Sequence, residues 1–200
     1  MKKIVLASNN PGKVREINQL FAELDIEVVP QSDFGVPEIE ETGLTFVENS
    51  ILKARNAAQH TGLPALADDS GIEVDALNGA PGIYSARFAG VGASDSDNLE
   101  KLLNDLRAIK NASKNARFQC LMVLMRHEND PTPLICQGTW EGEIIDKPQG
   151  ENGFGYDPVF YIPSENCTSA QLPADKKNAL SHRGKALQCL LDKLSRTSFT

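Results

Sequence analysis

The first thirty residues alternate between apolar runs and polar turns, which predicts a strand, a helix and a second strand. Residues 4–7 form a short apolar run that stops at polar Ser8, as a buried strand does. Apolar residues then recur at helical spacing, at Val14, Ile17, Leu20, Phe21 and Leu24. A second strand is predicted at residues 26–29, before Pro30. This order of elements favours a layered α/β architecture.

The next stretch predicts a helix and two strands. Thr45 and Glu48 have the spacing of a capping box, so a helix is expected over about residues 46–60. Residues 65–67 are typical of a short buried strand that leads into Asp68-Asp69-Ser70-Gly71, and residues 72–77 alternate like a half-exposed strand. Asn78-Gly79 then marks a turn.

The second half predicts two helices and three strands separated by glycine-rich loops. After a loop at residues 79–94, Ser94 or Asp95 caps a helix whose apolar face extends to Ile109. Two adjacent strands, 116–125 and 134–145, suggest an antiparallel hairpin, and a second loop follows at 147–158. The chain closes with a short strand at 159–162 and an amphipathic helix at 181–194. We therefore expect a mixed sheet with helices on both faces.

Length and composition indicate one globular domain over residues 1–200. The chain carries no internal repeat and no linker long enough to divide it. No run approaches the roughly 18 apolar residues of a membrane helix, and the N-terminal apolar run is too short for a signal peptide. We expect a cytoplasmic protein that does not bind a membrane.

Charge and cysteine content narrow the function further. Twenty Lys and Arg residues against 27 Asp and Glu residues give a net charge of −7, which opposes broad binding to nucleic acid. The four cysteines lack the spacing of zinc ligands. We expect them to be buried thiols that pack like small apolar side chains.

The clearest candidate for anion binding lies between the first strand and the first helix. Backbone N–H groups and the helix dipole both favour an anion at such a place. Val14 stands where a P-loop has Ser or Thr for magnesium, so this is not a P-loop. The alternative is a polar turn with a capping Asn and a solvated Lys. The residues concerned are Ser8, Asn9, Asn10, Pro11, Gly12 and Lys13.

A second candidate is acidic. Asp68 and Asp69 follow a predicted buried strand, and Glu40 and Glu41 lie upstream in an irregular segment. Carboxylates are hard oxygen ligands that suit Mg²⁺ bridging substrate phosphates. The alternative is an Asx turn, in which an aspartate bonds its own backbone.

Three further features carry less information when taken alone. Lys53 lies on the capped helix and could be a solvated surface residue. Glycines on both sides of Phe154 allow a ligand to approach the backbone while the ring offers a stacking surface. His182 and Arg183 fall in the first turn of the last helix, an unfavourable place for cations unless they serve an anion or a carbonyl oxygen.

Taken in chain order, these motifs closely resemble the inosine triphosphate pyrophosphatase family, in particular its bacterial branch. They are SNNPGK, EETGLTFVEN with Lys53, ADDSGIEVDAL, GAPGIYSAR, ENGFGYDP and SHRGKAL, and together they cover nearly the whole chain. The resemblance implies hydrolysis of ITP, dITP and XTP to the monophosphate and pyrophosphate. It also implies Mg²⁺, a homodimer, and an elongated mixed α/β fold of two lobes with the active cleft between them.

The resemblance assigns roles to single residues. Residues 8–13 match the phosphate loop, and Asp69 matches a catalytic acid described as base or metal ligand. An ordinary Asp is a weak base at neutral pH, so we favour metal binding and water positioning for Asp69. Glu40 or Glu41 matches the partner metal carboxylate, and the sequence does not decide between them. The remaining matches to nucleotide or base contacts are Ser70, Phe154, Gly155, Tyr156, Asp157, Lys177, His182 and Arg183.

Two alternatives stay open at this point. One is a nucleotide-binding sensor without turnover, against which the acidic residues argue, because carboxylates beside phosphate gain nothing without a metal. The other is a related pyrophosphatase for modified pyrimidine nucleotides.

Overall fold

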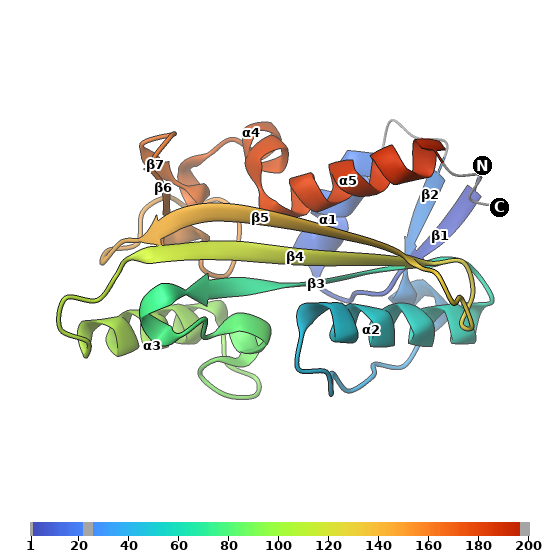
Figure 1. Ribbon diagram of the computed structural model, residues 1–200, viewed down its shortest axis with the longest axis horizontal. Coiled ribbons are helices and arrows are strands. Elements are labelled where there is room, and N and C mark those ends of the chain that lie inside the picture. The colour runs from blue at the N-terminus through green and yellow to red at the C-terminus, as the bar shows by residue number, and fades with distance from the viewer. Residues whose placement is uncertain (1, 22–25, 197–200) are drawn as a thin grey trace. The chain divides into compact units, whose positions relative to one another are not determined.

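The computed structural model describes residues 2–21 and 26–196 (Figure 1). The strands are β1 (Lys2–Leu6), β2 (Ile26–Pro30), β3 (Ala65–Val74), β4 (Asn115–Met125), β5 (Leu134–Ile144), β6 (Phe160–Ile162) and β7 (Cys167–Thr168). The helices are α1 (Pro11–Phe21), α2 (Phe46–Thr61), α3 (Asp95–Arg107), α4 (Ala174–Leu180) and α5 (His182–Arg196). No helix in this part of the chain is long and apolar enough to span a membrane.

The strands of the described residues form one seven-stranded sheet in the order β2-β1-β3-β4-β5-β6-β7. β1 pairs in parallel with β2 and with β3. β6 pairs antiparallel with β5 and with β7. The sheet is therefore mixed and is accompanied by helices, which confirms the predicted fold class.

The chain divides into two compact units. The first comprises Met1–Asp69, Cys120–Gly138 and Arg183–Thr200, and the second comprises Ser70–Gln119 and Thr139–His182. The boundaries fall inside β3, β4 and β5, so each of these strands contributes to both units.

In the first unit, side chains alternate along β1 to fill two cores. Ile4 and Leu6 pack with Ile17 and Phe21 of α1 and with Leu187 of α5. The intervening residues of β1 face the second core, with α2, whose members include Val5, Ala7, Ala54, Ala57 and Ala58. Helices α1 and α5 therefore cover one face of the sheet in this unit and α2 covers the other (Figure 1). Leu24 of the predicted helical face lies outside the described residues, as does the side chain of Leu20.

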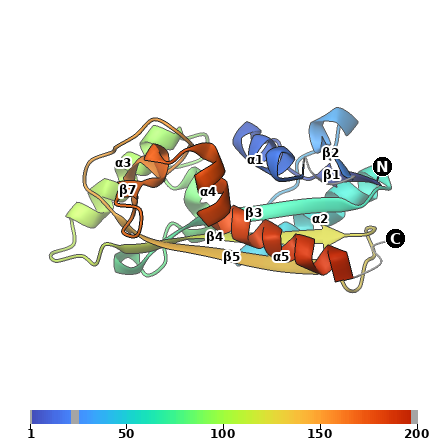
Figure 2. The ribbon, with the colours of Figure 1, turned by 90° about the horizontal axis from the view of Figure 1, so that it is seen from above.

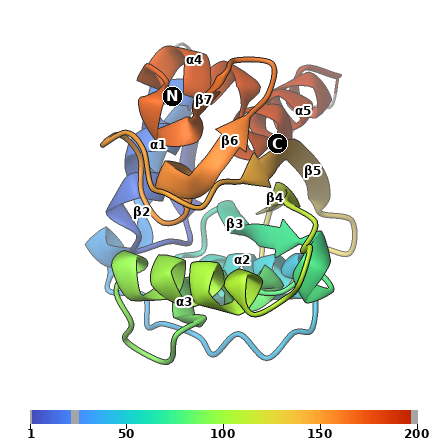
Figure 3. The ribbon, with the colours of Figure 1, turned by 90° about the vertical axis from the view of Figure 1, so that its left-hand side faces the viewer.

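In the second unit, an aromatic cluster forms the core. Phe160 of β6 packs against Phe118 of β4 at a ring-centroid distance of 4.6 Å and against Trp140 of β5 at 5.4 Å. Leu102 and Leu103 of α3 belong to the same core. Figure 3 shows elements of this unit, with α3 below β6.

Four local predictions need correction, two of them in β3 and the residues that follow it. β3 is one continuous strand through residues 68–71, where two separate strands at 65–67 and 72–77 were expected. A strand tolerates Asp68 and Asp69 here because lysines from other elements bind both carboxylates, as described below. Residues 75–77 form a 3-10 helix instead of a strand end, although Asn78 has the positive φ, 53°, of the predicted turn.

The other two corrections concern helices. α3 starts after the Ser94 cap as predicted, but it ends at Arg107, so Ile109 lies outside it and is exposed. α4 was not predicted, because its seven residues carry no apolar periodicity. The cap of α2 was predicted correctly, since Thr45 accepts a hydrogen bond from the Glu48 backbone.

Candidate active site

The N-terminus of α1 is held by Asn10. Its side-chain oxygen accepts hydrogen bonds from the backbone N–H of Gly12 at 2.9 Å and of Lys13 at 3.2 Å. Ser8 Oγ accepts from Asn10 N at 3.2 Å. Asn10 therefore caps the helix, as the structural alternative proposed. The solvated lysine of that alternative was wrong, because Lys13 Nζ lies 2.8 Å from Oδ1 of buried Asp68.

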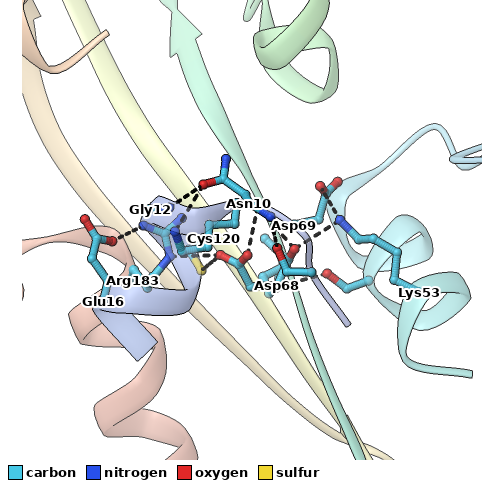
Figure 4. Close-up of polar contacts among 12 residues, drawn as sticks. Asn10, Gly12, Glu16, Lys53, Asp68, Asp69, Cys120 and Arg183 are labelled. Carbon is cyan, nitrogen blue, oxygen red and sulfur yellow. Dashed lines mark hydrogen bonds and ion pairs between the residues drawn. The ribbon is translucent and has the colours of Figure 1, made fainter. Parts of the chain in front are cut away.

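Asp68 is a buried carboxylate of the first unit that forms ion pairs with two cations (Figure 4). Besides Lys13, its Oδ2 accepts from Arg183 Nε at 3.0 Å, and the Cys120 thiol lies 3.5 Å away. Arg183 also pairs with Glu16 through Nη1. Burial acts to raise the pKa of the Asp68 carboxyl, but Lys13 and Arg183 overcome this effect and hold it well below its ordinary value. Asp68 is thus ionised and holds α1 and α5 together.

Lys53 joins two more carboxylates to this centre. Its Nζ lies 2.8 Å from Asp69 Oδ1 and 3.0 Å from Glu41 Oε1, and it donates to the Asp68 carbonyl at 3.0 Å. Burial acts to lower the pKa of Lys53, yet the charges of Asp69 and Glu41 raise it. Lys53 is therefore a half-buried, ion-paired cation and not the solvated surface residue of the alternative interpretation.

Asp69 differs from Asp68 in its electrostatics. Its side chain is almost buried, and this burial raises the pKa of the carboxyl above 3.8 despite the charges of Lys53 and Lys13. Oδ2 of Asp69 is buried and accepts no hydrogen bond within the described chain. A carboxylate oxygen with an unused lone pair is suited to a metal ion or a water molecule.

Between the two candidate glutamates, Glu41 is the one that lies against Lys53, whereas Glu40 is exposed. The segment before α2 is held by Asn49, a fully buried residue whose Oδ1 accepts from Gly43 N at 2.9 Å. Sequence reasoning missed Asn49. The available signal was its position: Asn49 lies in the first turn of α2, four residues before Lys53 and therefore on the same face of the helix.

In the predicted base-binding loop of the second unit, the Asp157 carboxylate accepts several hydrogen bonds. Its Oδ2 accepts from Phe154 N at 2.9 Å and from Lys177 Nζ at 2.8 Å, and its Oδ1 accepts from Ser169 Oγ at 2.7 Å. Lys177 Nζ also lies 5.3 Å from the centre of the Phe154 ring. The structure thus brings three of the predicted residues together, with Asp157 holding the loop and the lysine.

Other predicted residues of the second unit have packing contacts. Tyr156 is buried and donates from its hydroxyl to the Ser85 carbonyl at 2.8 Å, and its burial raises the pKa of the phenol. Gly155 N donates to Asp95 Oδ2 at 2.8 Å. His182 is buried and stacks on Phe118 at 4.8 Å with an interplanar angle of 13°. Ser70 is half-buried in β3, and in the first unit Asn9 donates to Glu38 at 2.8 Å.

Metal binding can be tested against these contacts. Among the described residues, no group of three or more His, Cys, Asp or Glu side chains is arranged to hold a metal ion. Magnesium in phosphate-processing sites is held by only one or two carboxylates, with waters and substrate phosphates completing its shell. Asp69, with its unused oxygen, and Glu41 fit that smaller requirement.

Comparison with known proteins identifies the family. The model of the Ham1 family matches residues 4–193. The chain belongs to the Ham1 family. Its likeness to the inosine triphosphate pyrophosphatases, stated from the motifs alone, is thereby confirmed.

Individual members of the Ham1 family match over nearly their full length. A relative from Vibrio parahaemolyticus, named dITP/XTP pyrophosphatase, is 61% identical over 195 residues, which cover 98% of each chain. A HAM1 protein structure from Coxiella burnetii has a TM-score of 0.92 and 54% identity, covering 98% of this chain and 100% of its own. The Staphylococcus aureus Ham1 structure has a TM-score of 0.86 and 44% identity, covering 98% of this chain and 99% of its own.

Proposed function

We propose that this Ham1-family chain hydrolyses deaminated purine nucleoside triphosphates, namely ITP, dITP and XTP, to the nucleoside monophosphate and pyrophosphate. The full-length similarity to a dITP/XTP pyrophosphatase supports the substrate class. The observation that carries the chemistry is the ion-paired cluster of Asp69, Lys53 and Glu41, which lies next to Lys13 and Asp68. It combines cations for a polyanion with a carboxylate that has an unused oxygen.

Lys13 and Lys53 would neutralise the phosphates. Hydrolysis between the α and β phosphates develops negative charge on the departing pyrophosphate, and preorganised cations stabilise this charge. Asp69 Oδ2 would accept a hydrogen bond from the attacking water and orient it toward the α phosphorus. The raised pKa of Asp69 also makes it a better proton acceptor than an exposed aspartate, although orientation remains its main role in this proposal.

We propose that the reaction requires Mg²⁺ and that Asp69 and Glu41 would hold this ion. When bound, the ion neutralises charge on the phosphate oxygens that it contacts. Lys53 bonds both carboxylates in this structure, so it would share them with the ion. Glu40 is the weaker candidate for a metal ligand because its residue is exposed, whereas Glu41 contacts Lys53.

For the base, we propose that Phe154 stacks on the purine and that Lys177, His182 and Arg183 contact the nucleotide. Hypoxanthine and xanthine carry a carbonyl at C6 where adenine carries an amino group, and a donor such as Arg discriminates between them. Arg183 holds Asp68 and Glu16 in this structure, so contact with a base requires it to exchange or share these partners. We further propose a cytoplasmic homodimer in which residues 1–200 act as one functional domain.

The experiment is a panel of nucleoside triphosphates with separate detection of phosphate and pyrophosphate. We expect pyrophosphate from ITP, dITP and XTP, little from ATP or GTP, and none when a chelator removes Mg²⁺. Asp69→Asn keeps the shape but loses the charge, and it should lower kcat about 10²-fold or more without unfolding the chain. The matched control is Asp146→Asn, which alters an aspartate with a side chain 71% exposed.

Each alternative gives a distinct result in this panel. A sensor would bind ITP without releasing pyrophosphate. A pyrimidine-specific enzyme would cleave modified pyrimidine triphosphates in preference to ITP. Near-normal turnover by Asp69→Asn would remove the proposed site even if the substrates were correct.

A further inference from the structure

Two cysteines of the first unit are in contact although they lie 53 positions apart. Cys136 lies on β5 and Cys189 on α5, and the Cys189 thiol donates to Cys136 Sγ at a sulfur–sulfur distance of 3.0 Å. Helix α5 runs beside this part of β5 (Figures 1 and 2). Both residues are free thiols. A disulfide requires about 2.05 Å, so an approach of about 1 Å would join them.

The surroundings give the two thiols different accessibility. Cys136 is buried in the core beneath α5, whereas Cys189 is half-buried. Burial, and then the hydrogen bond from Cys189, raises the pKa of Cys136 to about 12, which the nearby Lys193 ammonium partly offsets. Lys193 is fixed there by its bond to the Ile135 carbonyl at 2.6 Å. Cys189 is therefore the thiol that an oxidant in solution meets first, and Cys136 is placed to resolve the product.

The other cysteines of the described chain provide a contrast. Cys120 is fully buried against Asp68, and Cys167 lies on β7 in the second unit. Close pairing of two thiols, one accessible and one buried, is the arrangement of dithiols that respond to oxidants. Spacing along the sequence did not predict it, since residues 136 and 189 carry no CxxC signature.

We propose that Cys136 and Cys189 form a redox-responsive dithiol, which a hydroperoxide converts into an intramolecular disulfide that ties α5 to β5. The Cys189 sulfur attacks one oxygen of hydrogen peroxide, the O–O bond breaks, and a sulfenic acid and water form. The Cys136 sulfur then attacks the sulfenic sulfur, and its proton leaves with the hydroxyl as a second water. The two sulfurs lose two electrons and the peroxide gains them. A dithiol reductant reverses the change.

The disulfide has a physical consequence for the fold. It would close a loop between residues 136 and 189, which restricts the unfolded chain. We expect the oxidised protein to melt about 5 °C or more above the reduced protein. This site is separate from Asp69 and Lys53, so the proposal does not depend on the proposed function.

The experiment treats the full chain, first reduced and freed of reductant, with graded hydrogen peroxide. The intact mass should fall by two hydrogens per chain. Digestion with trypsin and a glutamate-specific protease, without reductant, should yield peptide 129–141 linked to peptide 186–193. These peptides contain Cys136 and Cys189 as their only cysteines. Cys189→Ser should lose the link and the rise in Tm, whereas Cys167→Ser should keep both.

Several outcomes would overturn the proposal. One is a wild-type chain in which Cys189 reaches sulfinic acid while Cys136 stays a free thiol. Another is a disulfide that joins two chains through Cys167 or Cys189. A third is an equal rise in Tm in the wild type and Cys189→Ser, because the stabilisation would then come from another change. Cys136→Ser should lose the link as well. If this variant does not fold, the linked peptides in the wild type and their absence in Cys189→Ser still test whether the disulfide forms.

Discussion

Arg183 donates from Nε to Oδ2 of Asp68 at 3.0 Å, across 115 positions of the sequence. The Arg183 and Asp68 side chains are 3% and 0% exposed, so this ion pair is buried. Lys13 binds the other oxygen of Asp68 at 2.8 Å. A single carboxylate thus forms ion pairs with a cation at the start of α1 and with another at the start of α5.

Asp68→Asn should therefore destabilise the chain strongly. The variant removes the carboxylate charge that faces half-buried Lys13 and leaves buried Arg183 with Glu16 as its remaining acidic partner. Breaking a buried pair in this way costs about 3–5 kcal/mol. Urea unfolding would measure the change in free energy. Asp146→Asn, which breaks an exposed pair with Lys114, should cost less than about 1 kcal/mol. Similar losses of unfolding free energy in the two variants would mean that the ion pairs of Asp68 contribute little to stability.

Lys13→Ala and Lys53→Ala should each lower kcat/KM for ITP by about 10- to 100-fold. Each variant removes a charge-assisted contact to phosphate, worth roughly 1.5–3 kcal/mol. The products should remain the monophosphate and pyrophosphate. Lys101→Ala is the control, because Lys101 pairs with Asp105 on the surface of α3. A change in base preference with unchanged phosphate affinity would contradict the assignment.

Arg183→Ala should lower the ratio of kcat/KM for ITP to that for ATP, chiefly by loss of ITP hydrolysis. A buried donor to the C6 carbonyl discriminates in this way, and the ratio is independent of how much protein is folded. Phe154→Ala should weaken all purine substrates together, because stacking does not depend on the C6 group. An unchanged ratio for Arg183→Ala would restrict Arg183 to holding Asp68. Loss of ITP alone in Phe154→Ala would exclude stacking.

Gly153→Ala should disrupt the loop more than Gly155→Ala. Both glycines have positive φ, 81° and 62°, so both variants incur backbone strain of about 1–2 kcal/mol. A Cβ at Gly153 would lie 2.1 Å from Asp157 Oδ2, whereas no atom lies within 4 Å of one at Gly155. The added loss should therefore appear as weaker thermal stability and a higher KM for ITP. Equal effects would show that the contact of Asp157 with this loop is unimportant.

Asp130 should produce part of the acid sensitivity of the fold. Hydrogen bonds from Arg126, at 2.9 Å from Nε, hold the pKa of the Asp130 carboxyl well below 3.8. A depressed pKa stabilises the fold above the unfolded value and loses this effect as pH falls through the folded value. Asp130→Asn should thus cost about 1–3 kcal/mol at pH 7 and progressively less below about pH 4. Urea unfolding from pH 7 to pH 3 tests this, and a constant difference would contradict it.

The local elements were predictable because their signals act over a few residues. The Thr45–Glu48 cap, the Ser94 cap and the apolar spacing of α1 each depend on neighbours in the chain. The order of motifs also sufficed to identify the family. In these features the sequence alone determined the outcome, since helix caps and periodicity express backbone geometry.

Tertiary structure decided what depends on partners distant in sequence. Residues 68–71 continue a strand in which Lys13 and Lys53 pair with the two aspartates, whereas the sequence pattern predicted two separate strands. Of the two neighbouring glutamates, Glu41 is the one that contacts Lys53, which the sequence did not decide. The contact of Cys136 with Cys189 arises from the packing of α5 on β5. Coulombic and covalent chemistry depend on distance in space, and only the folded chain sets that distance.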